Sequence, residues 1–345
     1  MSKRKNSNDN RVRVNRPERT QVEMQLLSLD QMLDKDHRAR IVWQFVNSLD
    51  LQPLYEGFKA TQGQSGRNAI APEILLALWL MATIDSISSA RELDRRTTTD
   101  IPYMWLCGGV SVNYHTLSDF RSNNSEYFEK MLVDTVTAMM AQGFVTLDTI
   151  GQDGMRVRAS AGSSSFRREP KLKELHKQAE AHVKKLREQG EDESARNAAD
   201  VAKRAAQQRA ATEQAERIAE ALRQVEELHQ QKEKRRKGDG EKARCSTTDP
   251  DARKMKMGDG GFRPAYNVQF ATDGDSRVIV AVDVTNTGSD RGEMSPMHDK
   301  VVETYQATPE KMLVDSAFAT KNDVKTVEQS GTKVYSTVYG EDSMK

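Results

Sequence analysis

The chain has 345 residues, of which 37% are hydrophobic and 30% charged, and its formal net charge is +1. This length predicts two or three domains, and the composition is typical of a soluble globular protein. A membrane protein is excluded, because the longest apolar run, residues 74–84, is shorter than the roughly 20 residues that span a bilayer. Cys107 and Cys245 form no CxxC pattern, which excludes a disulfide framework or structural zinc and fits a reducing cytosol.

Residues 1–20 predict a basic, disordered arm. They offer little to bury and contain two acidic residues, Asp9 and Glu18, against seven basic ones. Such an arm can lie along DNA phosphates or remain a solvated tail, and the sequence leaves both open. The basic residues are Lys3, Arg4, Lys5, Arg11, Arg13, Arg16 and Arg19.

Residues 21–142 predict a helical domain. Apolar spacing from Leu26 through Leu33 and Ile41 to Leu49 predicts two short helices, followed by a loop at 63–66. Further helices are predicted within 71–107, at 113–121 and at 125–142. Short helices with tight turns suit a helix-turn-helix DNA-binding domain, although any small helical bundle gives the same pattern.

Residues 144–150 alternate with a period of two, which predicts a strand. Residues 152–154 predict a turn, and 155–159 a second extended stretch. Residues 170–240 then predict a helical hairpin or coiled coil, broken at 189–192 and closed by the basic residues of 232–237. A purely structural coiled-coil protein is the alternative, but it leaves the flanking strands unexplained.

Strands return after this insertion. Residues 266–271 and 277–284 flank Asp273-Gly274, a hairpin signal. A helix at 290–306, a strand at 312–315, a helix at 320–331 and a strand at 333–339 follow. Alternation of strand and helix favours parallel pairing, so residues 143–345 predict an α/β domain with a mixed sheet.

Two aspartates have positions that suit metal chemistry. Asp153 and Asp315 are both predicted at strand ends, where carboxylates converge at the edge of a sheet. Two such carboxylates can hold a pair of Mg²⁺ ions for phosphoryl transfer. The alternative is that each caps a turn or a helix. Asp148 and Asp283 are predicted to be solvated strand residues.

Several blocks of sequence resemble the DDE transposases of bacterial insertion sequences. The blocks that resemble the first and second aspartate motifs are QDGMRVRA (152–159) and LVDSAF (313–318). Between them, STTDPDAR (246–253) and GGFRPAYNVQ (260–269) also match. Upstream, DIPYMWLCG (100–108) and NYHTLSDFR (113–121) resemble the helical DNA-binding domain of the same family.

This resemblance implies an RNase H-like fold for residues 143–345, with the helical insertion inside it and an all-α domain before it. It implies Mg²⁺- or Mn²⁺-dependent cleavage and transfer of DNA strands at terminal inverted repeats. Asp153 and Asp315 would be the catalytic metal ligands of a two-metal site. The implied partners are double-stranded DNA and a second copy of the chain or more, in the bacterial cytoplasm at the nucleoid.

The resemblance stops before the third acid of the family, a glutamate on a helix beyond the last predicted strand. No motif supports Glu341 or Asp342, and Glu303 and Glu328 lie on helices that are predicted to be amphipathic surface. The expectation is therefore a truncated chain with an incomplete metal site and no strand transfer. The alternative function is a DNA-binding repressor of transposition.

Six further residues are candidate DNA contacts. Arg156 and Arg158 alternate with Val157, which predicts one face beside Asp153, or merely an exposed strand face. Arg263 and Tyr266 follow a glycine-rich turn. His115 and Arg121 lie on the possible recognition helix, where the plainer interpretation is packing against the neighbouring bundle.

Overall fold

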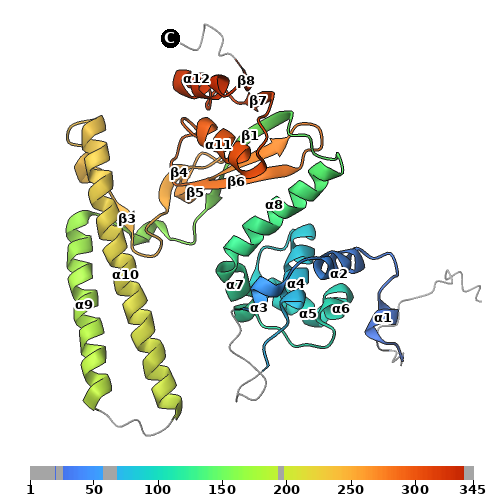
Figure 1. The fold of residues 1–345 in the computed structure, drawn as a ribbon. Helices are drawn as coiled ribbons and strands as arrows, with labels where there is room; N and C mark the ends of the chain where they lie inside the picture. The colour runs from blue at the N-terminus through green and yellow to red at the C-terminus, as the bar shows by residue number, and fades with distance from the viewer. Residues whose placement is uncertain (1–19, 21–25, 57–67, 193–197, 338–345) are drawn as a thin grey trace, which may run out of the picture. The chain divides into compact units, whose positions relative to one another are not determined.

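The computed structural model describes residues 20, 26–56, 68–192 and 198–337 (Figure 1). Its contacts divide the chain into two compact units, residues 1–129 and 130–345. Helix α8 (Ser125–Ala141) crosses this division. Apart from Thr20, the predicted basic arm lies outside the described residues, as does the predicted loop at 63–66.

The first unit is helical throughout its described part, as predicted. Helix α4 (Pro72–Ile84) buries nine of its thirteen residues. A helix that is apolar all round must be covered by others. The other helices of this unit are α1 (Leu29–Met32), α2 (Arg38–Ser48), α3 (Gln52–Tyr55), α5 (Ala90–Thr99), α6 (Ile101–Cys107) and α7 (Tyr114–Asn123).

Local signals set the helix ends from α4 to α7. Pro72 occupies the first turn of α4, where its missing N–H removes no helical bond. Ser89 and Asn113 cap α5 and α7 by accepting hydrogen bonds from the amides of Glu92 and Thr116. Gly108 ends α6 in the left-handed conformation, with φ of 56°. The predicted helices of this stretch are thus confirmed.

The stretch before α4 differs from the prediction. Three helices, not two, occupy residues 29–55. Leu26 and Ile41 were expected on an apolar face but are 93% and 63% exposed, whereas Leu33, Val42 and Val46 are buried. The four-residue helix α1 ends in extended backbone at Leu33. The first helix therefore begins after Leu26, and Ile41 lies on the exposed side of the separate helix α2.

A six-stranded mixed sheet organises the second unit (Figure 1). The strand order is β4-β5-β1-β7-β8, and β6 pairs with the part of β5 that β4 leaves unpaired. Strands β4, β5, β6 and β1 pair antiparallel, whereas β1, β7 and β8 pair parallel. The strands are β1 (Thr149–Arg158), β4 (Arg253–Lys256), β5 (Phe262–Asp273), β6 (Ile279–Thr285), β7 (Lys311–Val314) and β8 (Lys333–Ser336).

The predicted turn at residues 152–154 is wrong. Strand β1 runs without a break through Gln152, Asp153 and Gly154, and every residue from Ile150 to Arg158 pairs with β5. A long neighbouring strand supplies the ladder bonds that keep this stretch extended, which overrides the local turn preference of Asp-Gly. The predicted strand also starts late, at Thr149, although Val145 and Leu147 before it are buried.

Helices α11 (Met294–Tyr305) and α12 (Lys321–Gln329) pack on one face of the sheet. One buried cluster joins Met297 and Val301 of α11 to Ile150 and Val280, together with Val136 of α8. A second cluster lies around the β7 end of the sheet. It comprises Met294, Met312, Val314, Phe318 and Val327. The predicted helix at 290–306 begins at Met294, because Asp290 is engaged by the sheet, as described below.

The predicted helical insertion is present as two helices, α9 (Glu169–Asp192) and the longer α10 (Ala198–Arg235), which lie side by side (Figure 1). The break expected at 189–192 is wrong, since α9 continues to Asp192. At the base, β2 (Phe166–Arg167) pairs with β3 (Cys245–Ser246), and Leu172 packs against Ala221 and Val225. The short pair of strands fixes where the insertion leaves and rejoins the sheet domain.

Cys107 and Cys245 are both free and buried, as expected for a chain without a disulfide framework. Burial raises the pKa of each thiol to about 11. Among the helices that the structure describes, none is both long enough and apolar enough to cross a bilayer.

Asp273 closes the β5–β6 hairpin from inside the protein. The side chain is fully buried and accepts hydrogen bonds from the Ser276 amide and hydroxyl, at 2.9 and 2.6 Å, and from the Leu147 amide at 3.0 Å. Burial alone raises the pKa of this carboxyl, but the hydrogen bonds outweigh it and leave the pKa below its ordinary value. The carboxylate thus joins the hairpin to the segment that enters β1.

The Asp273→Asn variant should lose about 2 kcal/mol of unfolding free energy at pH 7, because its amide replaces an ionised acceptor. Since the folded pKa of Asp273 is lowered, this contribution is present above about pH 4 and is lost as the pH falls through the folded value. The gap between wild type and variant should therefore shrink in urea titrations from pH 7 to pH 3. Asp275→Asn, at an exposed position of the same turn, is the control. A gap that does not depend on pH would contradict this role.

Candidate metal site

The pairing of β1 with β7 brings Asp153 and Asp315 together. Their parallel register runs from Thr149 opposite Lys311 to Gln152 opposite Val314. Asp153 and Asp315 are the next residue on each chain, so they occupy neighbouring positions one step beyond the last pair. Adjacent strands lie about 4.8 Å apart. The two carboxylates, 162 positions apart in the sequence, therefore follow directly on paired residues of neighbouring strands.

Both side chains belong to the same face of the sheet. Gln152 and Val314, which pair with each other, are buried against the helices, whereas Asp153 and Asp315 are exposed. Successive side chains of a strand point to opposite faces. The two aspartates therefore share the face away from α11 and α12, where solvent and a large substrate have access.

Each carboxylate accepts a hydrogen bond from the residue that follows it in the sequence. Oδ1 of Asp153 accepts from the Gly154 amide at 2.7 Å, and Oδ1 of Asp315 accepts from the Ser316 hydroxyl at 2.9 Å. Within the described residues no donor reaches Oδ2 of either side chain. Exposed carboxylate oxygens are the ligands that Mg²⁺ and Mn²⁺ prefer, so the pair fits such an ion. In the described part of the chain, no group of three or more His, Cys, Asp or Glu side chains is arranged to bind a metal.

The other acids considered from the sequence are not part of this pair. Asp148 is exposed before β1, and Asp283 is exposed on β6. Asp283 pairs with Gln269, which places it on the opposite face from Asp153. Glu303 and Glu328 are exposed on α11 and α12, as predicted. Glu341 and Asp342 lie outside the described residues.

Arg156 is not beside Asp153, which corrects the sequence prediction. Because β1 is one continuous strand, residues 156 and 158 point to the face opposite residue 153. Arg156 donates to Asp290 at 3.0 Å, and its side chain is about three-quarters buried. Arg158 is exposed near the end of the strand. The difference arises because β1 has no turn between Asp153 and the two arginines.

Asp290 organises a buried polar cluster that the sequence prediction missed. Its carboxylate accepts from Asn267 at 2.8 Å, from Gln269 at 3.1 Å and from Arg156. Burial raises the pKa of Asp290, but these donors outweigh it and lower the pKa below its ordinary value. Gln152 joins the cluster by donating to Gln269 at 3.1 Å. The only sequence signal was a pair of polar residues, 267 and 269, on the buried face of β5.

Gly154 lies in the middle of this cluster, directly after Asp153. A Cβ atom at this position would lie 2.6 Å from Nε2 of Gln269 and 2.7 Å from Oδ1 of Asp290. Both side chains are fixed by the hydrogen bonds described above. The glycine thus lets a polar cluster pack against β1, and the strand that holds Asp153 is braced from behind.

Arg263 and Tyr266 are both engaged within the protein. Arg263 pairs with Asp259 at 2.7 Å and holds the pKa of that carboxyl at about 2, with help from the Gly261 amide. Tyr266 donates to Asp249 at 2.6 Å; its burial, and then this bond, raise the pKa of the phenol. Each residue therefore shapes the segment around β4 and β5.

On α7, Arg121 and His115 differ in their surroundings. Arg121 donates to the Ser88 carbonyl at 3.0 Å, and its guanidinium lies 4.3 Å from the ring centre of Trp79. This is the packing role considered in the sequence analysis. His115 is exposed and lies against Tyr114, with ring centres 4.0 Å apart. Both side chains are exposed, but only Arg121 is engaged by a hydrogen bond and a cation–π contact to other helices or loops.

Two family models match the chain. The model described as Transposase domain (DUF772) matches residues 27–123, and the model described as Transposase DDE domain matches residues 230–344. Together the matches cover more than half of the sequence. The chain belongs to the DDE transposases of insertion sequences. No curated protein and no solved structure gives a significant match.

The two matches give different support to the two aspartates of the candidate site. Asp315 lies within the second match, whereas Asp153 lies between the two matches and is supported by the strand register. The mixed sheet, the long helical insertion and the helical N-terminal region agree with the predicted RNase H-like fold. DDE transposases generally use divalent metal ions, which suits the carboxylate pair.

A Gly154→Ala variant tests the bracing of β1. The added methyl group would overpack the cluster formed by Asp290, Gln269 and Asn267, and should cost about 1–3 kcal/mol of unfolding free energy in urea denaturation. Gly151→Ala is the matched control on the same strand, because its Cβ would meet only the Thr272 carbonyl, at 3.9 Å. Equal stabilities of the two variants would contradict the close packing at Gly154.

Proposed function

We propose that this chain is a DNA transposase in which Asp153 and Asp315 hold Mg²⁺ or Mn²⁺ where the DNA strand is cut and transferred. The observation that supports this most directly is the parallel register of β1 and β7, which makes the two exposed aspartates neighbours on one face. The transposase matches on both sides of the insertion supply the class of reaction.

A bound Mg²⁺ would activate a water or a 3′-hydroxyl as the nucleophile and offset the charge on the departing oxygen. The protein's own contribution is positional. Ser316 and the amides of Gly154 and Ala317 hold one oxygen of each carboxylate, which orients the other toward the open face. Asp290 and Arg156 keep β1 in place from the opposite face. This arrangement fixes the site on strands rather than on loops.

We further propose that residues 21–142 read the terminal inverted repeats, that residues 143–345 carry the chemistry and that the arm at 1–20 follows the DNA backbone. The short helices from α4 to α7, joined by tight turns, support the first of these roles. His115 is the α7 side chain proposed to contact DNA, since Arg121 is committed to Ser88 and Trp79. Such a protein would work at the nucleoid.

A homodimer remains part of the proposal, because two DNA ends must be brought together. The apolar seam of the insertion is unsuitable as its interface. Ile218 and Val225 are buried, and Val225 packs with Leu172 of α9 within the same chain. The dimer contact must therefore use another surface.

Asp153→Asn and Asp315→Asn test the metal site without requiring activity. Each change removes one anionic ligand, so Mn²⁺ affinity, followed by electron paramagnetic resonance, should fall about 10- to 100-fold. Asp283→Asn is the control, because that residue is an exposed aspartate on the opposite face of the same sheet. Unchanged Mn²⁺ binding in both variants would rule out the assigned pair.

A second candidate function is occupation of the DNA ends without cleavage, which would repress transposition. It is favoured by the division of the chain into two compact units, since the first contains the helical transposase domain and would bind DNA without using the carboxylates of the second.

One experiment separates the two functions. Duplexes carrying the element's own ends are incubated with the full chain and Mg²⁺, and binding and nicking are measured in parallel. Against the expectation of no strand transfer that was drawn from the sequence, the transposase proposal expects nicking by the wild type, a loss of about 10²–10³-fold in the Asp153→Asn/Asp315→Asn variant, and DNA affinity that is unchanged. Selective binding without nicking by the wild type would select the repressor function instead.

A further inference from the structure

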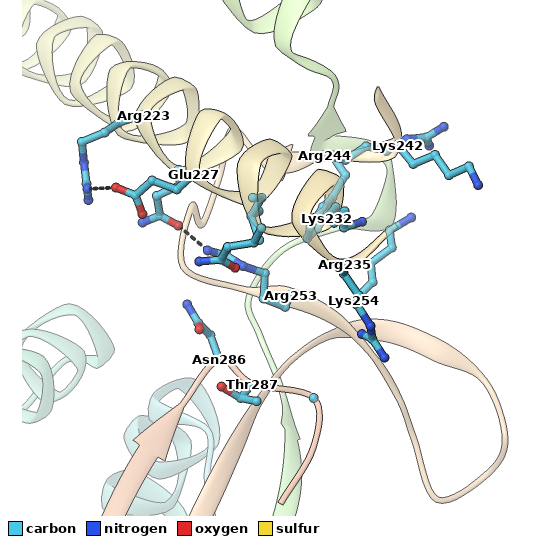
Figure 2. Close-up of a pocket in the computed structure, with 15 residues that line it drawn as sticks. Arg223, Glu227, Lys232, Arg235, Lys242, Arg244, Arg253, Lys254, Asn286 and Thr287 are labelled. Carbon is cyan, nitrogen blue, oxygen red and sulfur yellow. Dashed lines mark hydrogen bonds and ion pairs between the residues drawn. The ribbon is translucent and has the colours of Figure 1, made fainter. Parts of the chain in front are cut away.

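A basic cavity lies where the insertion meets the sheet (Figure 2). Its volume is about 730 Å³, and it is formed by the last turns of α10, the segment around residues 242–244, β4 and the loop after β6. Seven cationic side chains and one acid, Glu227, line it. The cations are Arg223, Lys232, Arg235, Lys242, Arg244, Arg253 and Lys254.

Local geometry assembles these charges from separate segments. Glu227, Gln231 and Arg235 follow one another at intervals of four residues, which places them on one face of α10. After the helix, Glu233 accepts hydrogen bonds from the amides of Gly238 and Gly240, which reverses the chain and returns Arg244 to the cavity. Strand β4 then adds Arg253 and Lys254 (Figure 2).

Two of the cations are neutralised within the chain. Arg223 is bound by Glu220 and Glu227, at 2.5 and 2.7 Å, and Lys242 is bound by Asp239 at 2.7 Å. These pairs are exposed and fix local geometry rather than leaving charge available. Glu227, the one acid in the lining, is therefore already paired with Arg223.

The remaining cations lack a carboxylate partner among the described residues. Lys232, Arg235 and Arg244 make no hydrogen bond or ion pair to any described residue, and all three are exposed. Lys254 is exposed, and its Nζ lies over the ring of Phe166, 5.3 Å from the ring centre. Arg253 donates to Gln224 at 2.6 Å and to the Pro250 carbonyl, which leave its charge in place. The cavity therefore concentrates positive charge in a chain whose net charge is only +1.

Stabilisation of the helix end does not explain this cluster. Cations in the last turn of a helix interact favourably with its dipole, which accounts for Lys232 and Arg235. Arg244, Arg253 and Lys254 come from other segments, and like charges repel. An anionic ligand offsets that repulsion.

We propose that this cavity binds the phosphodiester backbone of duplex DNA, which extends the contact of the proposed transposase beyond its metal site. Arginine and lysine are the usual ligands of backbone phosphates. The lining lacks an accessible aromatic platform for stacked bases, since Lys254 covers Phe166. This inference rests on the proposed function only for the identity of the nucleic acid.

The strand register places the cavity relative to the metal site. Arg253 of β4 and Arg158 of β1 both pair with Ala265 of β5. Asp153 lies five residues from Arg158 along β1, which corresponds to about 17 Å. Arg253 therefore shares with Arg158 the face of the sheet opposite Asp153, so a duplex in the cavity would lie on the other face from the metal ligands.

The test uses the full chain with Lys232, Arg235 and Lys254 all changed to Gln. The matched control changes Lys203, Arg209 and Arg217 to Gln, which removes the same charge from exposed positions of α10 outside the cavity. Binding to a fluorescent duplex without the element's ends is followed by anisotropy from 50 to 200 mM KCl. EDTA is present, so the result does not depend on the carboxylates, and failure of the metal site leaves this test intact.

The cavity variant should bind at least about tenfold more weakly than the control, and its salt slope should fall by up to about 3, because each lost phosphate contact removes about 0.9. Unfolding midpoints equal to that of the wild type verify that both variants fold. Equal affinities and slopes of the two variants would overturn the proposal. Displacement of the duplex by low millimolar inorganic phosphate at constant ionic strength would assign the cavity to a free anion and would also overturn it.

Discussion

The structure depends most on the position of β1 between β5 and β7. The antiparallel ladder with β5 keeps nine of the ten residues of β1 extended through an Asp-Gly sequence, and the parallel ladder with β7 covers only the first part of the strand. Asp153 lies where the second ladder ends. A slip of one residue would turn Asp153 toward the helices and Gly154 toward solvent. The same register that buries Ile150 and Gln152 therefore exposes the carboxylate beside Asp315.

Much of the fold could be predicted because its signals are local. Pro72, Ser89, Asn113 and Thr320 begin helices by mechanisms that act within one turn, and Asp273-Gly274 marks a hairpin. The failures have a different cause. The turn expected at 152–154 and the break expected at 189–192 both relied on Gly and Asp preferences. Pairing with β5 overrides the first, and α9 continues through the second.

The candidate site was partly predictable for a related reason. Motifs pointed to Asp153 and Asp315 as the proposed pair, and the β1–β7 register places the strands that lead to them side by side. The face of Arg156 could not be found, because it depends on whether β1 is continuous. The cluster around Asp290 was also beyond prediction, since its members come from β1, β5 and the loop before α11. Such contacts depend on tertiary packing, which has no signature in the spacing of a single segment.

The distribution of charge on the surface also depends on tertiary packing. A net charge of +1 gives no indication of a nucleic-acid partner, because it averages over the whole chain. Along α10, Arg217 and Arg223 have acidic partners three or four residues away, so their fields largely cancel. At the end of the same helix this compensation stops, and the fold adds cations from β4 and from the returning segment. A polyanion is thus attracted where cations have no acidic partner nearby, and the net charge of the chain does not show where that is.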